Sequence, residues 1–169
     1  MKFRFIRVFL GAPGGLSEEQ DAYHEAVGAC NEEKGLAIQT LLVPLTASRK
    51  TYPQGVIDEN IRACTYFLLA VDDTLGIAGN TFEHDWWLAR QCCADSKLPM
   101  RAAVALFKKQ FEGRPPDPVV ERFRASLEAD TGARCLDFRD VADFRAQVHG
   151  LLSGWLAAEA PETARAAEG

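Results

Sequence analysis

Short apolar stretches alternate five times with amphipathic segments along the chain. The apolar stretches are rich in β-branched and aromatic side chains, which is typical of β-strands. Each is followed by a segment whose apolar residues recur at helical spacing, as Tyr23, Ala26, Val27 and Cys30 do. The expected strands cover residues 3–11, 36–45, 65–73, 101–109 and 133–138. The expected helices cover residues 17–34, 56–64, 82–96, 118–129 and 140–160.

This alternation predicts a parallel β-sheet with helices on both faces. The run 65–73 is apolar almost throughout, as in a central strand that is covered on both faces. Right-handed crossovers then favour the strand order 2-1-3-4-5 of flavodoxin-like folds. We therefore expect one three-layer α/β domain over residues 1–160, followed by a flexible tail over residues 161–169.

Local signals also predict how the first helix begins and ends. Ser17, with Gln20 three residues later, has the spacing of a capping box. Gly35 is expected to act as the C-cap, because glycine adopts the left-handed conformation that often ends a helix. The second strand is then expected to begin directly after this glycine.

Composition narrows the class of protein. Of 169 residues, 47% are hydrophobic and 25% are charged, which is ordinary for a soluble globular domain. The net charge of −5 argues against a broad nucleic-acid-binding surface. No apolar run reaches 18 residues, and the first run alternates like a strand, so we expect neither a membrane span nor a signal peptide.

The cysteines and histidines suggest a reducing compartment and no structural metal. Five cysteines are scattered through apolar segments, which favours reduced, buried thiols in a cytoplasmic protein. The chain has no C-x-x-C or H-x-x-x-H spacing, so no zinc site is expected from spacing alone. The sequence also lacks a G-x-S-x-G nucleophile elbow and gives no clear Cys–His pair.

A ligand site is expected where the strand order reverses. For the order 2-1-3-4-5 this point lies at the carboxyl ends of strands 1 and 3. The loop after strand 1 allows close backbone approach but is neither a G-x-G-x-x-G nor a Walker A loop. The acidic turn that follows would repel a phosphate, so a ribose or a base is the ligand expected against this loop. The alternative is a Gly/Pro turn that only precedes an acidic, capped helix. The expected substrate-binding residues in this loop are Gly11, Ala12, Pro13, Gly14 and Gly15.

The loop after strand 3 brings carboxylates to the same edge. Asp72 and Asp73 end the strand and are expected to bind ribose hydroxyls, whereas Glu83 and Asp85 lie in the first turn of the next helix. Glu83 and Asp85 are about 200° apart around a helix, so they cannot both serve one site. Glu83 is the first candidate for a catalytic carboxylate, and Asp85 is the second. The alternative is an acidic turn that only complements the helix dipole.

Three separated segments resemble TIR-like domains found before STAND-type NTPases and as standalone bacterial proteins. They are RVFLGAPGGLSEEQDAYHEAV, YPQGVIDENIRACTYFLLAVDDTLG and NTFEHDWWLA, in that order, and the resemblance covers residues 5–108. The chain departs from the family pattern at Gly11, Ala12 and Gly15, where the family has Ser, Ser and Asp. The family's glutamate-aromatic pair aligns best with Asp85 and Trp86.

The wider TIR and nucleoside 2-deoxyribosyltransferase-like group implies an activity. The resemblance implies cleavage of the N-glycosidic bond of NAD or a nucleoside by a carboxylate at the switch point. It implies no bound cofactor, since NAD would be a substrate. The alternative is a non-catalytic module that signals or binds a protein partner, through self-association or through the polar loop at residues 46–55.

Overall fold

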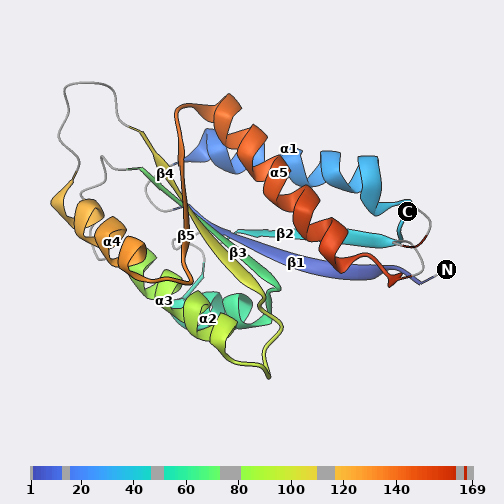
Figure 1. The fold of residues 1–169 in the computed structure, drawn as a ribbon, viewed down its shortest axis with the longest axis horizontal. Coiled ribbons are helices and arrows are strands. Elements are labelled where there is room, and N and C mark those ends of the chain that lie inside the picture. Colours follow the sequence, from blue (N-terminus) through green and yellow to red (C-terminus); the bar gives the residue numbers. More distant parts are fainter. Residues whose placement is uncertain are drawn as a thin grey trace.

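The computed structural model describes residues 2–12, 16–46, 52–72, 81–109, 117–162 and 166. Within these residues, strands and helices alternate as the sequence pattern predicts (Figure 1). The strands are β1 (Arg4–Gly11), β2 (Thr40–Thr46), β3 (Tyr66–Asp72), β4 (Ala102–Lys108) and β5 (Arg134–Phe138). The helices are α1 (Ser17–Cys30), α2 (Gln54–Ala63), α3 (Thr81–Ala94), α4 (Pro118–Ala129) and α5 (Val141–Glu159), and the π-helical turn η1 (Asn31–Gly35) extends α1.

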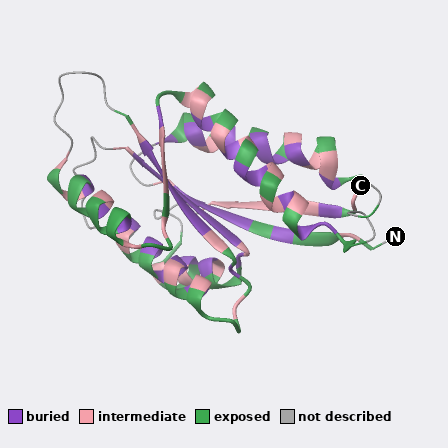
Figure 2. Ribbon diagram, viewed as in Figure 1, coloured by how far each residue is buried: buried purple, intermediate pink, exposed green. Residues whose placement is uncertain are grey.

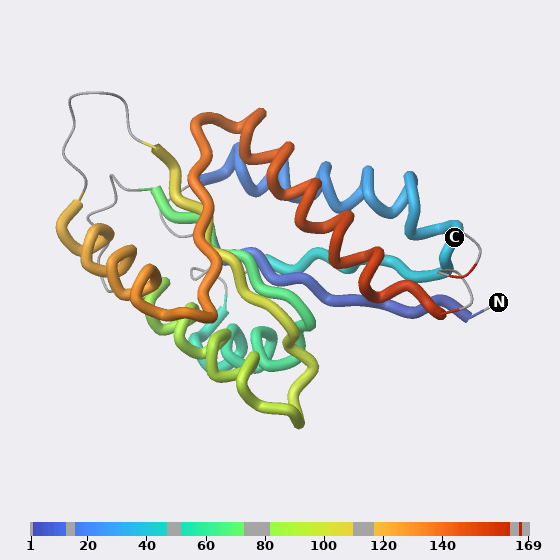
Figure 3. Tube along the Cα trace, in the orientation of Figure 1, coloured from blue at the N-terminus to red at the C-terminus, as the bar shows by residue number. Residues whose placement is uncertain are grey.

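The strands form one parallel sheet in the order β2-β1-β3-β4-β5, so the predicted topology is confirmed. Helices α1 and α5 lie side by side on one face, and α2, α3 and α4 cover the other (Figures 1 and 3). β3 is buried along almost its whole length, as expected for a central strand. This three-layer arrangement is the flavodoxin-like or TIR-like fold.

Each face of the sheet has its own apolar core (Figure 2). Because successive side chains of a strand point to opposite faces, Leu68 and Ala70 pack under α1 and α5, whereas Phe67 and Leu69 pack under α2 to α4. The same alternation determines the face to which a polar residue at a strand end belongs. Among the described helices, none is long and apolar enough to cross a membrane.

The first helix begins at Ser17 as expected, but both of its predicted caps are wrong. Leu16 occupies the N-cap position and no side chain caps α1, so Ser17 begins the helix without the expected capping box. At the other end, Gly35 lies inside η1 rather than at a C-cap, and a Cβ there would lie 2.7 Å from the carbonyl oxygen of Thr40. The chain reverses at Gln39, whose φ is 55°, and β2 therefore begins at Thr40 instead of residue 36.

At the amino ends of the strands, a buried carboxylate anchors the last helix. Glu159 of α5 is 2% exposed. Its Oε1 accepts a hydrogen bond from the Tyr66 hydroxyl at 2.8 Å and lies 3.1 Å from Arg101 Nη1. Its Oε2 lies 2.9 Å from Arg4 Nη2, in an ion pair without hydrogen-bond alignment. These contacts join α5 to β1 and β3 at the edge opposite the predicted site.

Candidate functional site at the carboxyl edge of the sheet

The switch point lies where β1 and β3 end side by side. Gly11 is the last residue of β1 and pairs with Leu69 of β3. A Cβ at Gly11 would lie 3.2 Å from Leu69 Cδ1 and 3.6 Å from Phe67 Cζ, so the glycine faces the α2–α4 layer. Ala12 packs against the opposite core, under α1 and α5. The other predicted loop residues, Pro13, Gly14 and Gly15, lie outside the described residues, as does Asp73.

Asp72 belongs to a cluster on the α1 side of the sheet, which we call the strand-end cluster (Glu19, Asp72 and Lys108). Asp72 pairs with Lys108 in the β3–β4 register, and Lys108 Nζ donates a hydrogen bond of 2.7 Å to Glu19 Oε1. Glu19 is 2% exposed. This hydrogen bond, together with the nearby charge of Asp72, raises the pKa of Lys108. The ammonium group therefore stays charged between the carboxylates of Glu19 and Asp72.

Glu83 faces away from α2. It lines a cavity of about 240 Å³ between α3 and α4, whose other lining residues include Trp87, Arg122 and Ser126. Trp86, in contrast, is fully buried and packs between Phe67 and Phe123, whereas the adjacent Trp87 is 38% exposed. The position of Glu83 beside α4 separates it from the α2 side of the switch point.

Asp85 turns to the opposite side of α3, toward α2. It is 2% exposed, and its Oδ1 accepts a hydrogen bond of 3.1 Å from Gln54 Nε2. The same amide nitrogen donates to Asp58 Oδ1 at 2.7 Å, and His84 Nε2 lies 3.1 Å from that oxygen. We call these four residues the α2–α3 cluster. The divergence of Glu83 and Asp85 agrees with their predicted angular separation on the helix.

The α2–α3 cluster is made by residues in the amino-terminal halves of two neighbouring helices. α2 follows β2 and α3 follows β3, so both amino ends lie at the carboxyl edge of the sheet. Burial would raise the pKa of Asp58, but hydrogen bonds from Gln54 and His84 outweigh burial and hold this pKa below its usual value. Asp58 is therefore anionic at neutral pH. Sequence reasoning missed Gln54 and Asp58, although their i, i+4 spacing places them on one helix face.

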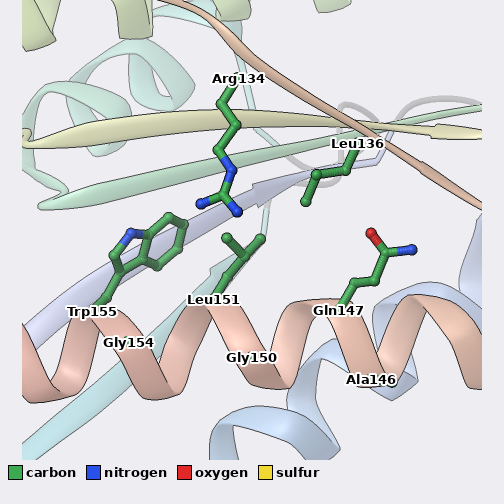
Figure 4. A pocket seen from close by; sticks show the side chains of 8 residues that line it. All are labelled: Arg134, Leu136, Ala146, Gln147, Gly150, Leu151, Gly154 and Trp155. Carbon is green, nitrogen blue, oxygen red and sulfur yellow. The ribbon is translucent and has the colours of Figure 1, made fainter.

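Two further cavities lie on the face covered by α1 and α5. One, of about 350 Å³, lies between β5 and α5, where Arg134 reaches across toward Trp155 and Leu151 (Figure 4). The indole of Trp155 is held by stacking on Tyr66, with ring centroids 4.4 Å apart. The other is a groove of about 540 Å³ between α1 and α5. Neither cavity includes a predicted site residue.

Comparison with solved structures finds a TIR domain with the same fold. The crystal structure of the RPS4 and RRS1 TIR domain heterodimer matches with a TM-score of 0.54 and 7% identity, over 89% of this chain and 97% of that chain. Rubredoxin oxygen:oxidoreductase from Desulfovibrio gigas matches with a TM-score of 0.48 and 8% identity, over 93% of this chain and 37% of that chain. No protein-family model and no curated protein matches the sequence. The TIR-like fold is thus confirmed, and at this identity the likeness concerns the fold alone.

Proposed function

We propose that this TIR-like domain binds NAD or a related nucleoside at the β1–β3 switch point and cleaves its N-glycosidic bond, with Asp85 as the reacting carboxylate. The observation that carries the proposal is the position of Asp85. It is a buried carboxylate near the amino end of α3, and the amide of Gln54 on α2 donates a hydrogen bond to one of its oxygens. Gly11, the last residue of β1 at the switch point, faces the same α2–α4 layer as Asp85.

The chemistry requires only a well-placed negative charge. As the bond between the ribose C1′ and the nicotinamide nitrogen breaks, its electron pair moves to the pyridinium nitrogen and positive charge develops on the sugar. A carboxylate stabilises this oxocarbenium-like centre or attacks it to form a short-lived ester. Water then adds its oxygen to C1′ and loses a proton. Nicotinamide leaves as a neutral base, so cleavage of NAD needs no general acid, whereas the base of an uncharged nucleoside has to take a proton from water as it leaves.

Glu83 is the first carboxylate that the sequence indicates, so the experiment compares Glu83→Gln with Asp85→Asn. Purified protein, dilute and crowded at high concentration, is incubated with NAD and a nucleoside panel, and free base is measured by chromatography. We expect Asp85→Asn to lower base release by more than about 100-fold, because even a misplacement of about 1 Å costs that much. The matched control is Glu121→Gln, which changes an exposed first-turn carboxylate on α4.

Each result leads to a different assignment. Loss of base release in Asp85→Asn, with the Glu121→Gln control unchanged, supports the proposal. Loss of base release only in Glu83→Gln assigns the reaction to the cavity between α3 and α4. No base release by the folded wild-type protein under any condition would overturn the enzymatic proposal. Thermal unfolding of each variant separates a lost activity from a lost fold.

A second candidate function, a protein-interaction module, is favoured by the groove between α1 and α5. Its floor consists of small side chains, and the ion pair Glu25–Arg145, with a 2.9 Å contact, lies at the groove. The solved TIR structure with the same fold is a heterodimer. Of the loop first suspected from the sequence, residues 47–51 lie outside the described residues. If this groove mediates self-association, Ala146→Arg will shift a concentration-dependent dimer to monomer in light scattering, and an unchanged mass distribution will argue against it.

A further inference from the structure

Three side chains that can ligate a metal converge at the α2–α3 cluster. Asp58, His84 and Asp85 each offer one ligand atom, and the three atoms lie within 4.8 Å of one another. They come from two helices, so the convergence depends on how α2 packs on α3. Among the described residues, this is the one group of three or more histidine, cysteine or carboxylate ligands with such spacing.

The distances suit a small divalent ion. Zinc lies about 2.0–2.1 Å from imidazole nitrogen and about 2.0–2.2 Å from carboxylate oxygen, so neighbouring ligand atoms in a tetrahedral site are about 3.2–3.5 Å apart. His84 Nε2 and Asp58 Oδ1 are already 3.1 Å apart. The widest pair of ligand atoms is at most 4.8 Å apart, so an ion at bonding distance from all three ligands requires that pair to close by up to about 1.5 Å, which side-chain rotation can provide.

Gln54 occupies the position between the two carboxylates. Its Nε2 donates to Asp58 at 2.7 Å and to Asp85 at 3.1 Å, so a positively polarised NH₂ group already draws together oxygens from two helices. A side-chain amide carries an acceptor oxygen beside that nitrogen. Rotation of the amide would present Oε1 to an ion, or would leave the fourth position to water.

We propose that Asp58, His84 and Asp85 bind a divalent transition-metal ion of the zinc class, which joins the amino-terminal half of α2 to the amino-terminal half of α3. One imidazole and two carboxylates favour such an ion over magnesium or calcium, which prefer oxygen ligands alone. The ion's two positive charges would balance the two carboxylates. The site does not depend on the N-glycosidic chemistry, although it shares Asp85 with it.

The chain contains a matched control for the histidine. His149 Nε2 lies 3.0 Å from Glu33 Oε2, so it forms a second half-exposed histidine–carboxylate pair. Among the described residues, no third ligand joins this pair. His84 and His149 each lie beside one carboxylate, but among the described residues only His84 has a second carboxylate, that of Asp85, within reach of the same ion.

The test is a titration of chelator-treated full-length protein with zinc, followed by calorimetry and by thermal unfolding. We expect one ion per chain. His84→Ala and Asp58→Asn should each weaken binding by at least about 100-fold, since even the loss of a supporting residue costs 10–100-fold, whereas His149→Ala should bind normally. A hundredfold excess of zinc over Kd should raise Tm by about 5–10 °C in the wild type and the His149→Ala control.

Cobalt(II) substitution identifies the ligand type. A visible spectrum of a tetrahedral nitrogen–oxygen site, without a thiolate charge-transfer band, supports the proposal. A thiolate band would show that cysteines bind the ion and would overturn the proposal. The proposal would also fail if the protein binds no zinc, or if His84→Ala binds zinc as tightly as the wild type. The zinc titration contains no nucleotide, and base release is measured with chelator present. The metal site and the N-glycosidic activity are therefore tested independently, and failure of one does not decide the other.

Discussion

Replacing Glu159 with Gln tests how the last helix is anchored. The carboxylate is 1% exposed at its side chain, whereas the paired Arg4 and Arg101 side chains are 52% and 56% exposed. Ion pairs with half-exposed arginines contribute about 0–1 kcal/mol each. The buried Tyr66 hydroxyl donates to a charged acceptor, which contributes about 1.5–3 kcal/mol. An amide keeps part of this hydrogen bond, so we expect a loss of about 2 kcal/mol in the free energy of unfolding.

This loss is measurable by thermal and urea unfolding monitored by circular dichroism. For a domain of this size, about 2 kcal/mol corresponds to a Tm decrease of about 4–8 °C. The matched control is Glu25→Gln, because Glu25 pairs with Arg145 at the same 2.9 Å distance but is 61% exposed. We expect the control to change stability by less than about 0.5 kcal/mol. Equal Tm values for the two variants would refute the argument that burial, rather than distance, determines the contribution.

Two further predictions concern pH and thiol chemistry. Asp137→Asn should destabilise the protein by about 1 kcal/mol at neutral pH, because it removes a two-point ion pair with Arg124. This ion pair lowers the pKa of Asp137. The pair therefore stabilises the fold fully above the usual carboxyl pKa of about 4, and this stabilisation is lost as the pH falls through the lowered pKa. Urea titrations across that pH range should show the free energies of unfolding of wild type and variant converge. In native protein, a thiol reagent should react only with the half-buried Cys93 and Cys135, and the other three thiols should appear on denaturation. Burial raises the pKa of Cys64 to about 12, so rapid labelling of that thiol would contradict the described packing.

The strand order was predictable because it depends on patterns that extend over many residues. The apolar run of β3 indicated a strand covered on both faces, and the alternation of element types left few allowed topologies. The end of α1 was not predictable from Gly35, because glycine signals a helix end only where nothing else stabilises continued helix. Here Asn31 exchanges hydrogen bonds with the backbone of Leu42, which supports the π-helical turn that carries the chain beyond the expected end.

The candidate site was predictable only as far as helical geometry extends. The angle between residues two apart in a helix indicated that Glu83 and Asp85 face different ways, but not that α4 lies beside one and α2 beside the other. Metal-binding motifs are recognised in a sequence by ligands that are close together along the chain, whereas His84 and Asp58 are 26 positions apart and meet through helix packing. Gln54 carried no chemical signal of its own, yet its amide joins both carboxylates. Polar groups at the amino ends of neighbouring helices therefore deserve to be compared as a set, because a parallel sheet brings those ends to one edge whatever their separation along the chain.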